Sequence, residues 1–540
     1  MKRRAFLVAA ASGMFASCEV RDGTVLPPGE LQGPDIALGH ALRDGGLPPP
    51  VEEKRIGIAI VGAGIGGLAA AWRLARHGVT DITLFELEVA AGGNARSGEN
   101  AVSPYPLGAH YLPLPGPEAT DLRDLLADLG VLIGDPQARL PRYDERYLVH
   151  APQERLYHGG LWHEGLFPRA AASPRDIEQM QRFDALIGAF KERRGADGRR
   201  AFAIPSLLAG RHPGSDALDS GSMQDWLRGQ GFDSPLLDWS VNYGCRDDYG
   251  ARAVDVSAWA GLHYFASRIG TAQHADPHSV LTWPEGNGWL VRQMLAWLAA
   301  RGVPPLRTGA VCTRVETTPA HVLLDVYHAN EKRSVRYRAE RLIWAAPAFS
   351  LARAWRNPPA GFAAAAGAIQ TSPWLVANLT LDGMPEDSGP AGLAWDNVLH
   401  DSPALGYVVA THQRIRRAPG PTVLTYFRPL AEMAPHQARA LLATQSWQAW
   451  VEPMLAELAK PHPQLRQQLR RIDLWRWPHA MPRPVPGFRS APIRALLAGA
   501  ASGNGALLFA HSDLSGLPLF EEAHFAGVRA AQLALGLTQA

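Results

Sequence analysis

Residues 55–97, RIGIAIVGAGIGGLAAAWRLARHGVTDITLFELEVAAGGNARS, decide the fold of this chain. Residues 56–61 form a short apolar run rich in β-branched side chains, which is typical of a buried parallel strand. A glycine turn follows, then a stretch over 65–77 that predicts a helix, and then a second apolar strand over 82–85. The order strand, glycine turn, helix, strand predicts the opening unit of a Rossmann-type α/β domain.

The turn between the first strand and the helix carries the pattern G-x-G-x-x-G at Gly62, Gly64 and Gly67. One glycine permits the tight turn, one lets the backbone approach a pyrophosphate, and one lets the helix pack on the strand. Glu86 ends the second strand 24 residues after Gly62, where a carboxylate accepts hydrogen bonds from ribose hydroxyls and repels a 2′-phosphate. The helix offers its N-terminal amides to the phosphates. We therefore predict a dinucleotide site that includes Gly62, Ala63, Gly64, Ile65, Gly66, Gly67 and Glu86.

Further along, the chain resembles the flavin-containing amine oxidase and phytoene desaturase superfamily. That family follows the acidic strand end with GGRxRT, and here Gly92–Ser97 reads GGNARS. The order and spacing of several short motifs, rather than any single one, carry the resemblance over about residues 55 to 535. These motifs are Pro106–Tyr111, Pro284–Gly288, Val311–Val315, Leu342–Pro347, Arg476–Pro482 and Leu507–Asp513.

The resemblance implies a fold and a cofactor. The fold class is α/β, with a Rossmann-type FAD/NAD(P)-binding domain interleaved with an α+β substrate domain, and the cofactor is FAD. Asp513 is implied to contact the ribityl and pyrophosphate region, although it is displaced by one residue from the family's Ala-Gly-Asp pattern. The helix that begins near Phe520 is implied to point its amides at the flavin pyrimidine ring. Further implied cofactor contacts are Gly92, Gly93, Asn94, Arg96, Gly108, Ala109 and Val311.

Composition agrees with a large soluble enzyme. The 540 residues are 46% hydrophobic and 19% charged, so the chain can bury a sizeable core. The net charge of +2 argues against a nucleic-acid partner, which requires a basic face. No cysteine and histidine spacing suits a zinc site and no nucleophile elbow is present, so we expect neither a metal nor a covalent nucleophile. The expected partner is a small-molecule substrate, and the oligomeric state is left open.

The first 54 residues are predicted to be an export signal and a tether. Met1–Leu7 contains the twin-arginine pattern RRxFL, an apolar stretch follows, and Phe15–Cys18 resembles a lipoprotein cleavage box. We expect a signal over 1–18, export by the twin-arginine route, and a lipid anchor at Cys18. The product would be a periplasmic or membrane-anchored lipoprotein. The proline- and glycine-rich stretch 19–54 is predicted to be a tether with one short helix over 35–43.

The remaining motifs divide the chain between the two domains. The FAD-binding domain is expected over 55–140, 301–350 and 486–540. The substrate domain is expected over 141–300, which is mainly helical, and over 351–485. Within the latter, 372–427 alternates apolar and polar residues like an antiparallel sheet. Predicted helices lie at 120–130, 175–195, 222–230, 253–268, 288–301 and 434–458.

Two departures from the family bear on the chemistry. Amine oxidases of this family place a lysine at a water beside flavin N5, but the best candidate strand, 374–381, has none, and the five lysines of the chain lie elsewhere. Where the cage tyrosine of the family would fall, residues 515–520 carry leucine. A positively charged amine is therefore not clearly provided for. The residues that could line the site are His110, Tyr111, Trp477 and His511.

Three functions stay open on the sequence alone. The first is an FAD-dependent oxidoreductase that transfers a hydride from an amine or amino acid to flavin N5, with oxygen or another redox partner as electron acceptor. The second is a desaturase-like dehydrogenase acting on an apolar substrate, which the missing lysine and cage and the membrane anchor favour. The third is a flavin-binding envelope protein without turnover. The commonest activity of the family favours the first.

Overall fold

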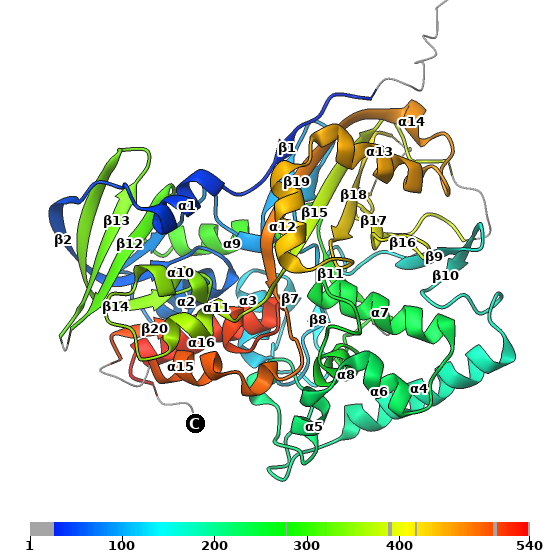
Figure 1. The fold of residues 1–540 in the computed structure, drawn as a ribbon, viewed down its shortest axis with the longest axis horizontal. Coiled ribbons are helices and arrows are strands. Elements are labelled where there is room, and N and C mark those ends of the chain that lie inside the picture. The colour runs from blue at the N-terminus through cyan, green and yellow to red at the C-terminus, as the bar shows by residue number, and fades with distance from the viewer. Residues whose placement is uncertain are drawn as a thin grey trace, which may run out of the picture.

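A computed structural model describes residues 26–276, 278–318, 320–386, 391–415, 418, 420–500 and 505–537. The predicted signal and lipid anchor fall on residues 1–25 and so lie outside the described residues. Figure 1 shows two sheets, helices packed against each of them, and a separate group of helices near the second sheet. The chain passes between these parts several times, so the two domains are interleaved.

The first sheet belongs to the nucleotide-binding domain (Figure 1). Its strands β2, β3, β14 and β20 pair in parallel, as the predicted strand–helix–strand unit requires. Helices α2 (Ile65–Arg76) and α16 (Phe520–Ala534) cross closely, since a Cβ on Gly527 would lie 2.1 Å from the carbonyl oxygen of Gly66. The strands are β2 (Pro50–Val61), β3 (Ile82–Phe85), β12 (Ala310–Thr317), β13 (Val322–His328), β14 (Arg333–Trp344) and β20 (Leu507–Phe509).

The second sheet has eight strands in the order β1-β19-β15-β18-β17-β16-β9-β10. The interior strand β15 is buried along its whole length because both faces of the sheet are covered there. One face packs against α12 (Pro435–Thr444) and α13 (Trp447–Leu458). The other face turns the aromatic side chains of Trp374, Phe427 and Trp477 inward. The strands are β1 (Leu31–Gln32), β9 (Glu154–His158), β10 (Leu161–Glu164), β15 (Thr371–Leu381), β16 (Asp396–Leu399), β17 (Gly406–Val409), β18 (Thr422–Pro429) and β19 (Leu469–Pro482).

Helix α7 (Pro235–Tyr249) connects the helical group to the second sheet. Ser234 caps its first turn and proline occupies its first position, a combination that favours a helix start. Its end is fixed on β15, where Ser372 Oγ donates to the carbonyl oxygen of Tyr249 at 2.7 Å. The other helices of this group are α4 (Pro174–Glu192), α5 (Ser215–Ser220), α6 (Met223–Gly229) and α8 (Ala258–Ala266).

The remaining elements complete the two domains. They are β4 (Ser97–Glu99), β5 (Pro104–Pro106), β6 (Tyr111–Pro113), α3 (Thr120–Asp128), β7 (Leu132–Ile133), β8 (Arg142–Tyr143), β11 (Val280–Thr282), α10 (Ala348–Ala354), α11 (Phe362–Gly367), α14 (Leu465–Gln468) and α15 (Pro492–Ala500). Among the described residues, no helix combines the length and the apolar character that crossing a bilayer requires.

The stretch predicted as a tether over 19–54 is part of the fold from residue 26 onward. β1 pairs in parallel with β19, α1 (Ile36–Asp44) contacts β12 and α10, and β2 already begins at Pro50. The helix predicted over 35–43 is confirmed, with Asp35 as its N-cap. The tether prediction was wrong for these residues because composition shows the prolines and glycines but not the distant strand with which β1 pairs.

Other helix predictions also change. α9 (Gly288–Ala299) packs against α2 in the core of the nucleotide-binding domain, not in the substrate domain as the range 141–300 predicts. The single helix predicted over 434–458 is two, α12 (Pro435–Thr444) and α13 (Trp447–Leu458), because α12 ends at its C-cap Gln445 and Ser446 caps the start of α13. α7 is absent from the predicted helices.

Candidate active site

The glycine turn forms an open cradle at the start of α2. Gly62 has φ +100°, which glycine adopts without strain, and a Cβ on Gly67 would lie 1.9 Å from the Gly62 carbonyl oxygen. Gly64 is the N-cap of α2 and offers no side chain to the first amides of the helix, so an anion can bind them. Gly93 lies opposite, and a Cβ there would meet only the Gly64 Cα, at 3.5 Å. The two segments are hydrogen-bonded to each other, with Gly92 N donating to the Ala63 carbonyl oxygen at 2.9 Å, and neither glycine places a side chain beside the helix start where a diphosphate would bind.

Glu86 lies directly after β3, where the sequence places it, and backbone amides hold it. Its Oε2 accepts from Ala63 N at 2.8 Å and its Oε1 accepts from Glu88 N at 3.0 Å. Burial raises the pKa of this carboxyl above its usual range. Each oxygen keeps a further lone pair, so the carboxylate can also accept a ribose hydroxyl. Val311 lies near this acid, because Ala310 N donates to the Glu86 carbonyl oxygen at 2.8 Å.

Two residues predicted to contact the cofactor have protein partners of their own. Arg96 Nη1 donates to Glu88 Oε2 at 3.0 Å. Asp513 Oδ2 accepts from Ala348 N at 2.8 Å, and its Oδ1 lies 3.3 Å from His511 Nδ1. Because protein groups already occupy these side chains, the contacts of Arg96 and Asp513 with the cofactor stay predictions.

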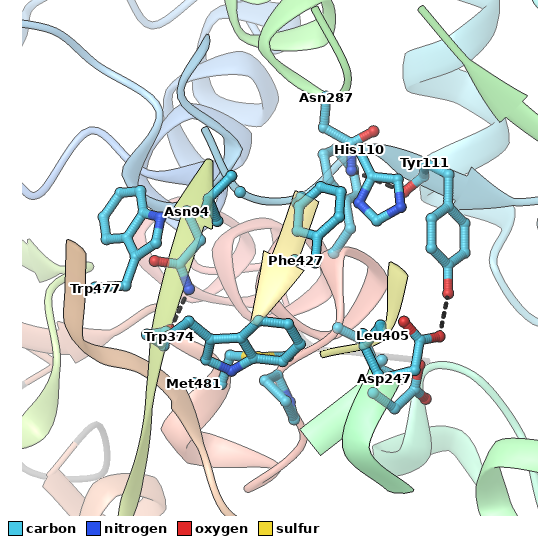
Figure 2. Close-up of a pocket in the computed structure, with 18 of the residues that line it drawn as sticks. Asn94, His110, Tyr111, Asp247, Asn287, Trp374, Leu405, Phe427, Trp477 and Met481 are labelled. Atoms are coloured by element: carbon cyan, nitrogen blue, oxygen red, sulfur yellow. Dashed lines mark hydrogen bonds between the residues drawn. The ribbon is translucent and has the colours of Figure 1, made fainter. Parts of the chain in front are cut away.

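A cavity of about 150 Å³ extends from the end of this cradle. Its walls come from the segment that includes Asn94, from residues 108–111, from α7, from the sheet strands β15 and β18, and from the start of α16. In Figure 2, Asn94 and Trp477 lie at one end of the cavity, and Tyr111 and Asp247 lie at the other. Gly108, Ala109 and Phe520, which the resemblance assigns to the flavin, also line this cavity.

The end of the cavity at Tyr111 is acidic. Tyr111 Oη donates to Asp247 Oδ2 at 3.0 Å (Figure 2). Arg268 Nη2 donates to both carboxylate oxygens of Asp248, at 2.6 and 2.7 Å. Glu521, in the first turn of α16, also lines the cavity and is 4% exposed.

The carboxyl groups of this acidic end hold their protons unusually tightly. Burial, together with the charge of Asp248, raises the pKa of Asp247 to about 7. Burial raises the pKa of Glu521 to about 7 as well. Three carboxyl groups face one guanidinium, that of Arg268, so the cavity has an excess of potential negative charge. Such a surplus is relieved when a cation enters the site.

Aromatic side chains form the wall beside the acidic end. The ring of His110 stacks on Phe427, with centroids 4.2 Å apart and planes at 22°. Burial lowers the pKa of His110 to about 3, so this imidazole is neutral at physiological pH and acts as an apolar surface. Trp374 and Trp477 extend the wall toward Asn94 (Figure 2).

The motif Pro284–Gly288 positions this wall. Asn287 N donates to the carbonyl oxygen of Ala109 at 3.1 Å, and its side-chain amide donates to that of Tyr111 at 2.9 Å. Gly286 has φ +61°, and a Cβ there would lie 2.7 Å from the Cα of His110. The backbone of residues 109–111 is thereby held between the cradle and the cavity.

Of the four residues predicted to line the site, His110, Tyr111 and Trp477 line this cavity. His511 does not, because Asp513 N donates to its Nδ1 at 3.1 Å and holds the ring in the turn after β20. Among the described residues that line the cavity, Arg268 is the one basic side chain besides the neutral His110, and none is lysine. Leu519 lines the cavity where the family's cage tyrosine would fall.

Sequence reasoning missed the carboxylates of the acidic end. Asp247 and Asp248 lie near the end of α7, a helix that the sequence analysis does not predict. The pair Ser234-Pro235 is a helix-start signal that could have located it. The approach of Arg268 and Glu521 to these acids depends on how distant segments pack and leaves no signal in the sequence.

A family model described as NAD(P)-binding Rossmann-like domain matches residues 60–129. Tryptophan 2-monooxygenase of Allorhizobium ampelinum is 41% identical over 59 residues, which are 11% of this chain and 8% of that protein. The chain therefore aligns with less than a tenth of this curated relative. Both matches support the Rossmann-type prediction for the first part of the chain.

Solved structures resemble almost the whole chain. Putrescine oxidase bound to putrescine has 17% identity and a TM-score of 0.64, over 90% of this chain and 100% of that one. Cyclohexylamine oxidase from Brevibacterium oxydans has 17% identity and a TM-score of 0.60, over 89% and 99%. A fatty acid isomerase from P. acnes that produces CLA has 15% identity and a TM-score of 0.60, over 87% and 97%. The predicted two-domain, amine oxidase-like fold is confirmed.

Proposed function

We propose that this protein is an FAD-dependent oxidoreductase that oxidises an amine at the carbon next to nitrogen. The observation that carries the proposal is the acidic end of the cavity. There, Asp247, Asp248 and Glu521 meet one guanidinium, that of Arg268, beside an aromatic wall. The amine-oxidase resemblance and the shared fold supply the reaction type, and the charge of the cavity selects the substrate.

The cradle fits the adenosine diphosphate part of FAD. Gly64 and Gly93 place no side chain beside the start of α2, the α2 amides offer donors to a diphosphate there, and Glu86 offers acceptors to a ribose. The family resemblance assigns Gly108 and Phe520 to the flavin ring, and both line the cavity. When bound, FAD would supply the redox chemistry by accepting one hydride, that is two electrons and a proton, from the substrate carbon.

The charge balance of the cavity favours a cationic substrate without a carboxylate. With all groups ionised, three negative charges from Asp247, Asp248 and Glu521 face one positive charge, a balance of −2. The one guanidinium is already paired with Asp248, so it offers little to the carboxylate of an amino acid. An ammonium group would pair with Asp247 and Glu521, whereas a neutral substrate would leave these two acids without a cation in a buried site.

Asp247, oriented by Tyr111, can also accept a proton from the substrate. An amine arrives as an ammonium ion at neutral pH, but a hydride leaves readily only from the carbon next to a neutral amine. Asp247, with a pKa of about 7, can accept the ammonium proton, and the Tyr111 hydroxyl fixes the orientation of its carboxylate. Loss of the hydride leaves an iminium ion, which water hydrolyses to a carbonyl compound and an amine.

The desaturase-like alternative has one feature in its favour. The wall of His110, Phe427 and Trp374 suits an apolar chain, and no lysine lines the cavity among its described residues. An apolar substrate gives the three carboxyl groups no partner, however, and a flavin-binding protein without turnover gives them no role. Amine oxidation accounts for both the aromatic wall and the acids.

A turnover screen with FAD-loaded protein tests the proposal. The substrates are amines with an apolar or aromatic body, their alcohol counterparts of equal shape, and unsaturated fatty acids, each assayed with oxygen and with an artificial dye. We expect turnover of amines but not of alcohols or fatty acids. Turnover of a fatty acid alone would establish the desaturase-like alternative, and bound flavin without turnover of any substrate would establish the non-catalytic one.

We further propose export by the twin-arginine route and a lipid anchor at Cys18, supported by RRxFL and the Ala-Ser-Cys sequence. Replacing Arg3 and Arg4 together by lysine should hold the protein in the cytoplasm. Cys18→Ser should release it from the membrane fraction. Fractionation that finds both variants distributed like the unaltered protein would remove this proposal.

A further inference from the structure

Two histidines and an aspartate meet at one edge of the eight-stranded sheet. His158 ends β9, and His400 directly follows β16, which pairs with β9 in parallel. The pairing brings the two imidazoles together, with centroids 4.2 Å apart and planes at 62°. One potential ligand atom from each of His158, His400 and Asp401 lies within 4.8 Å of the other two. None of the three lines the cavity of the candidate active site.

Both imidazoles have a buried nitrogen that lacks a hydrogen-bond partner. His400 Nδ1 lies 2.7 Å from Asp401 Oδ1, so the proton of a neutral His400 belongs on Nδ1 and Nε2 carries a lone pair. That Nε2 is buried and has no partner among the described residues, and the same is true of His158 Nδ1. A buried imidazole nitrogen without a partner has lost its hydration without compensation, which a ligand at that nitrogen would restore.

The geometry points to a binding site for a divalent transition-metal ion of the zinc class on His158 and His400, with Asp401 orienting His400. Neutral imidazoles are preferred ligands of such ions, whereas Mg²⁺ and Ca²⁺ prefer oxygen. A carboxylate that accepts from the second nitrogen of a ligating histidine fixes its tautomer and orientation. The Asp401 side chain is 77% exposed, so the histidine pair lies close to the protein surface.

A bound ion would stabilise the link between the sheet and helix α7. The Trp239 ring of α7 stacks on His400, with centroids 4.6 Å apart, and its Nε1 donates to the His400 carbonyl oxygen at 3.0 Å. The same helix carries Asp247 at its other end. The ion would therefore support the helix that bears the acidic end of the cavity without contacting substrate. This inference is independent of the proposed amine oxidation.

The sequence alone does not reveal this histidine pair, because only strand pairing brings the two residues together. His158 and His400 are 242 residues apart in the chain, so no motif spacing joins them. They become neighbours because His400 N donates to the carbonyl oxygen of Tyr157 at 3.0 Å, which extends the β9–β16 register by one residue. The expectation of no metal site rests on spacing alone and does not address such a pair.

Calorimetric titration of tag-free, chelator-treated, FAD-loaded protein with Zn²⁺ and with Mg²⁺ tests the site, with thermal unfolding as a second readout. We expect one equivalent of Zn²⁺ to bind and to raise the unfolding temperature, and Mg²⁺ not to compete. Asp401→Asn, at an exposed position, should weaken Zn²⁺ binding about 10- to 100-fold. His158→Ala and His400→Ala should abolish it. With Cu²⁺ as a probe, electron paramagnetic resonance should show coupling to two imidazole nitrogens.

His412→Ala is the matched control, because His412 also neighbours another histidine, His150, but its Nε2 is bonded to a backbone carbonyl at 2.7 Å. This variant should bind Zn²⁺ like the unaltered protein. Absence of Zn²⁺ binding, or binding that Asp401→Asn, His158→Ala and His400→Ala leave unchanged, would overturn the inference. If both alanine variants fail to fold, the Asp401→Asn titration decides.

Discussion

Asp247→Asn is the perturbation that separates amine recognition from general integrity of the site. Asparagine keeps the size of the side chain and can still accept from Tyr111, but it removes the negative charge. A hydrogen bond to a charged group contributes about 1.5–3 kcal/mol. Loss of this energy from the transition state corresponds to a fall in kcat/KM for the amine of about 10- to 150-fold, which is the effect we expect. The assay is dye-coupled turnover at about pH 8, where the carboxylate of the unaltered protein is ionised.

The same substitution should leave the fold at least as stable. The folded-state pKa of Asp247, about 7, lies above that of an unfolded aspartate, about 3.9, so its contribution to stability is full below about pH 4 and is lost as pH rises through 7. Asparagine cannot ionise, so the variant does not lose folding stability as pH rises through 7. At about pH 8 it should therefore unfold at an equal or higher temperature than the unaltered protein. Asp44→Asn, at an exposed position on α1, is the control and should change neither quantity. Unchanged amine turnover by Asp247→Asn, or a fall in turnover that merely follows a loss of stability, would refute the reasoning.

Three further predictions concern the cofactor, the pH dependence and the electron acceptor. Glu86→Ala should weaken FAD binding by about 1.5–3 kcal/mol, measured by fluorescence titration of the apoprotein, and unchanged affinity would exclude the ribose contact. Amine kcat/KM should rise through about pH 7 as Asp247 and Glu521 ionise, and the rise should flatten when both are replaced by their amides. Chemically reduced enzyme should react more slowly with oxygen than with a dye in stopped-flow mixing, because no lysine lines the cavity among its described residues; comparable rates would show that another group does the work of the lysine.

The nucleotide-binding start of the chain could be predicted closely because its signals are local. The strand at 82–85, the helix predicted over 65–77 and the acid at Glu86 all appear within a residue or two of their expected places, since turn glycines and apolar runs act on their immediate neighbours. Segments that depend on remote partners could not be predicted. β1 exists because β19 is beside it, and α9 joins the nucleotide-binding core because α2 offers it a surface.

The residues of the candidate site also differ in whether a local sequence signal predicts them. His110, Tyr111 and Trp477 lie in the short motifs that carry the family resemblance, and all three line the cavity. Asp247 and Glu521 were missed because only their burial and their charged neighbours mark them as site residues. These neighbours lie on other segments of the chain, so no local pattern points to them. His511 was misplaced because its partner, the Asp513 amide, lies two residues away and turns the ring from the cavity.

Anaerobic mixing of FAD-loaded protein with an apolar amine tests the central claim most directly. The flavin absorbance band should bleach in a single phase, with one carbonyl product formed for each flavin reduced, and Asp247→Asn should slow the bleaching at the same amine concentration. An enzyme that retains FAD but is bleached by no amine, or one bleached equally well by the alcohol of the same shape, would contradict the claim that the acidic end of the cavity selects a cationic substrate.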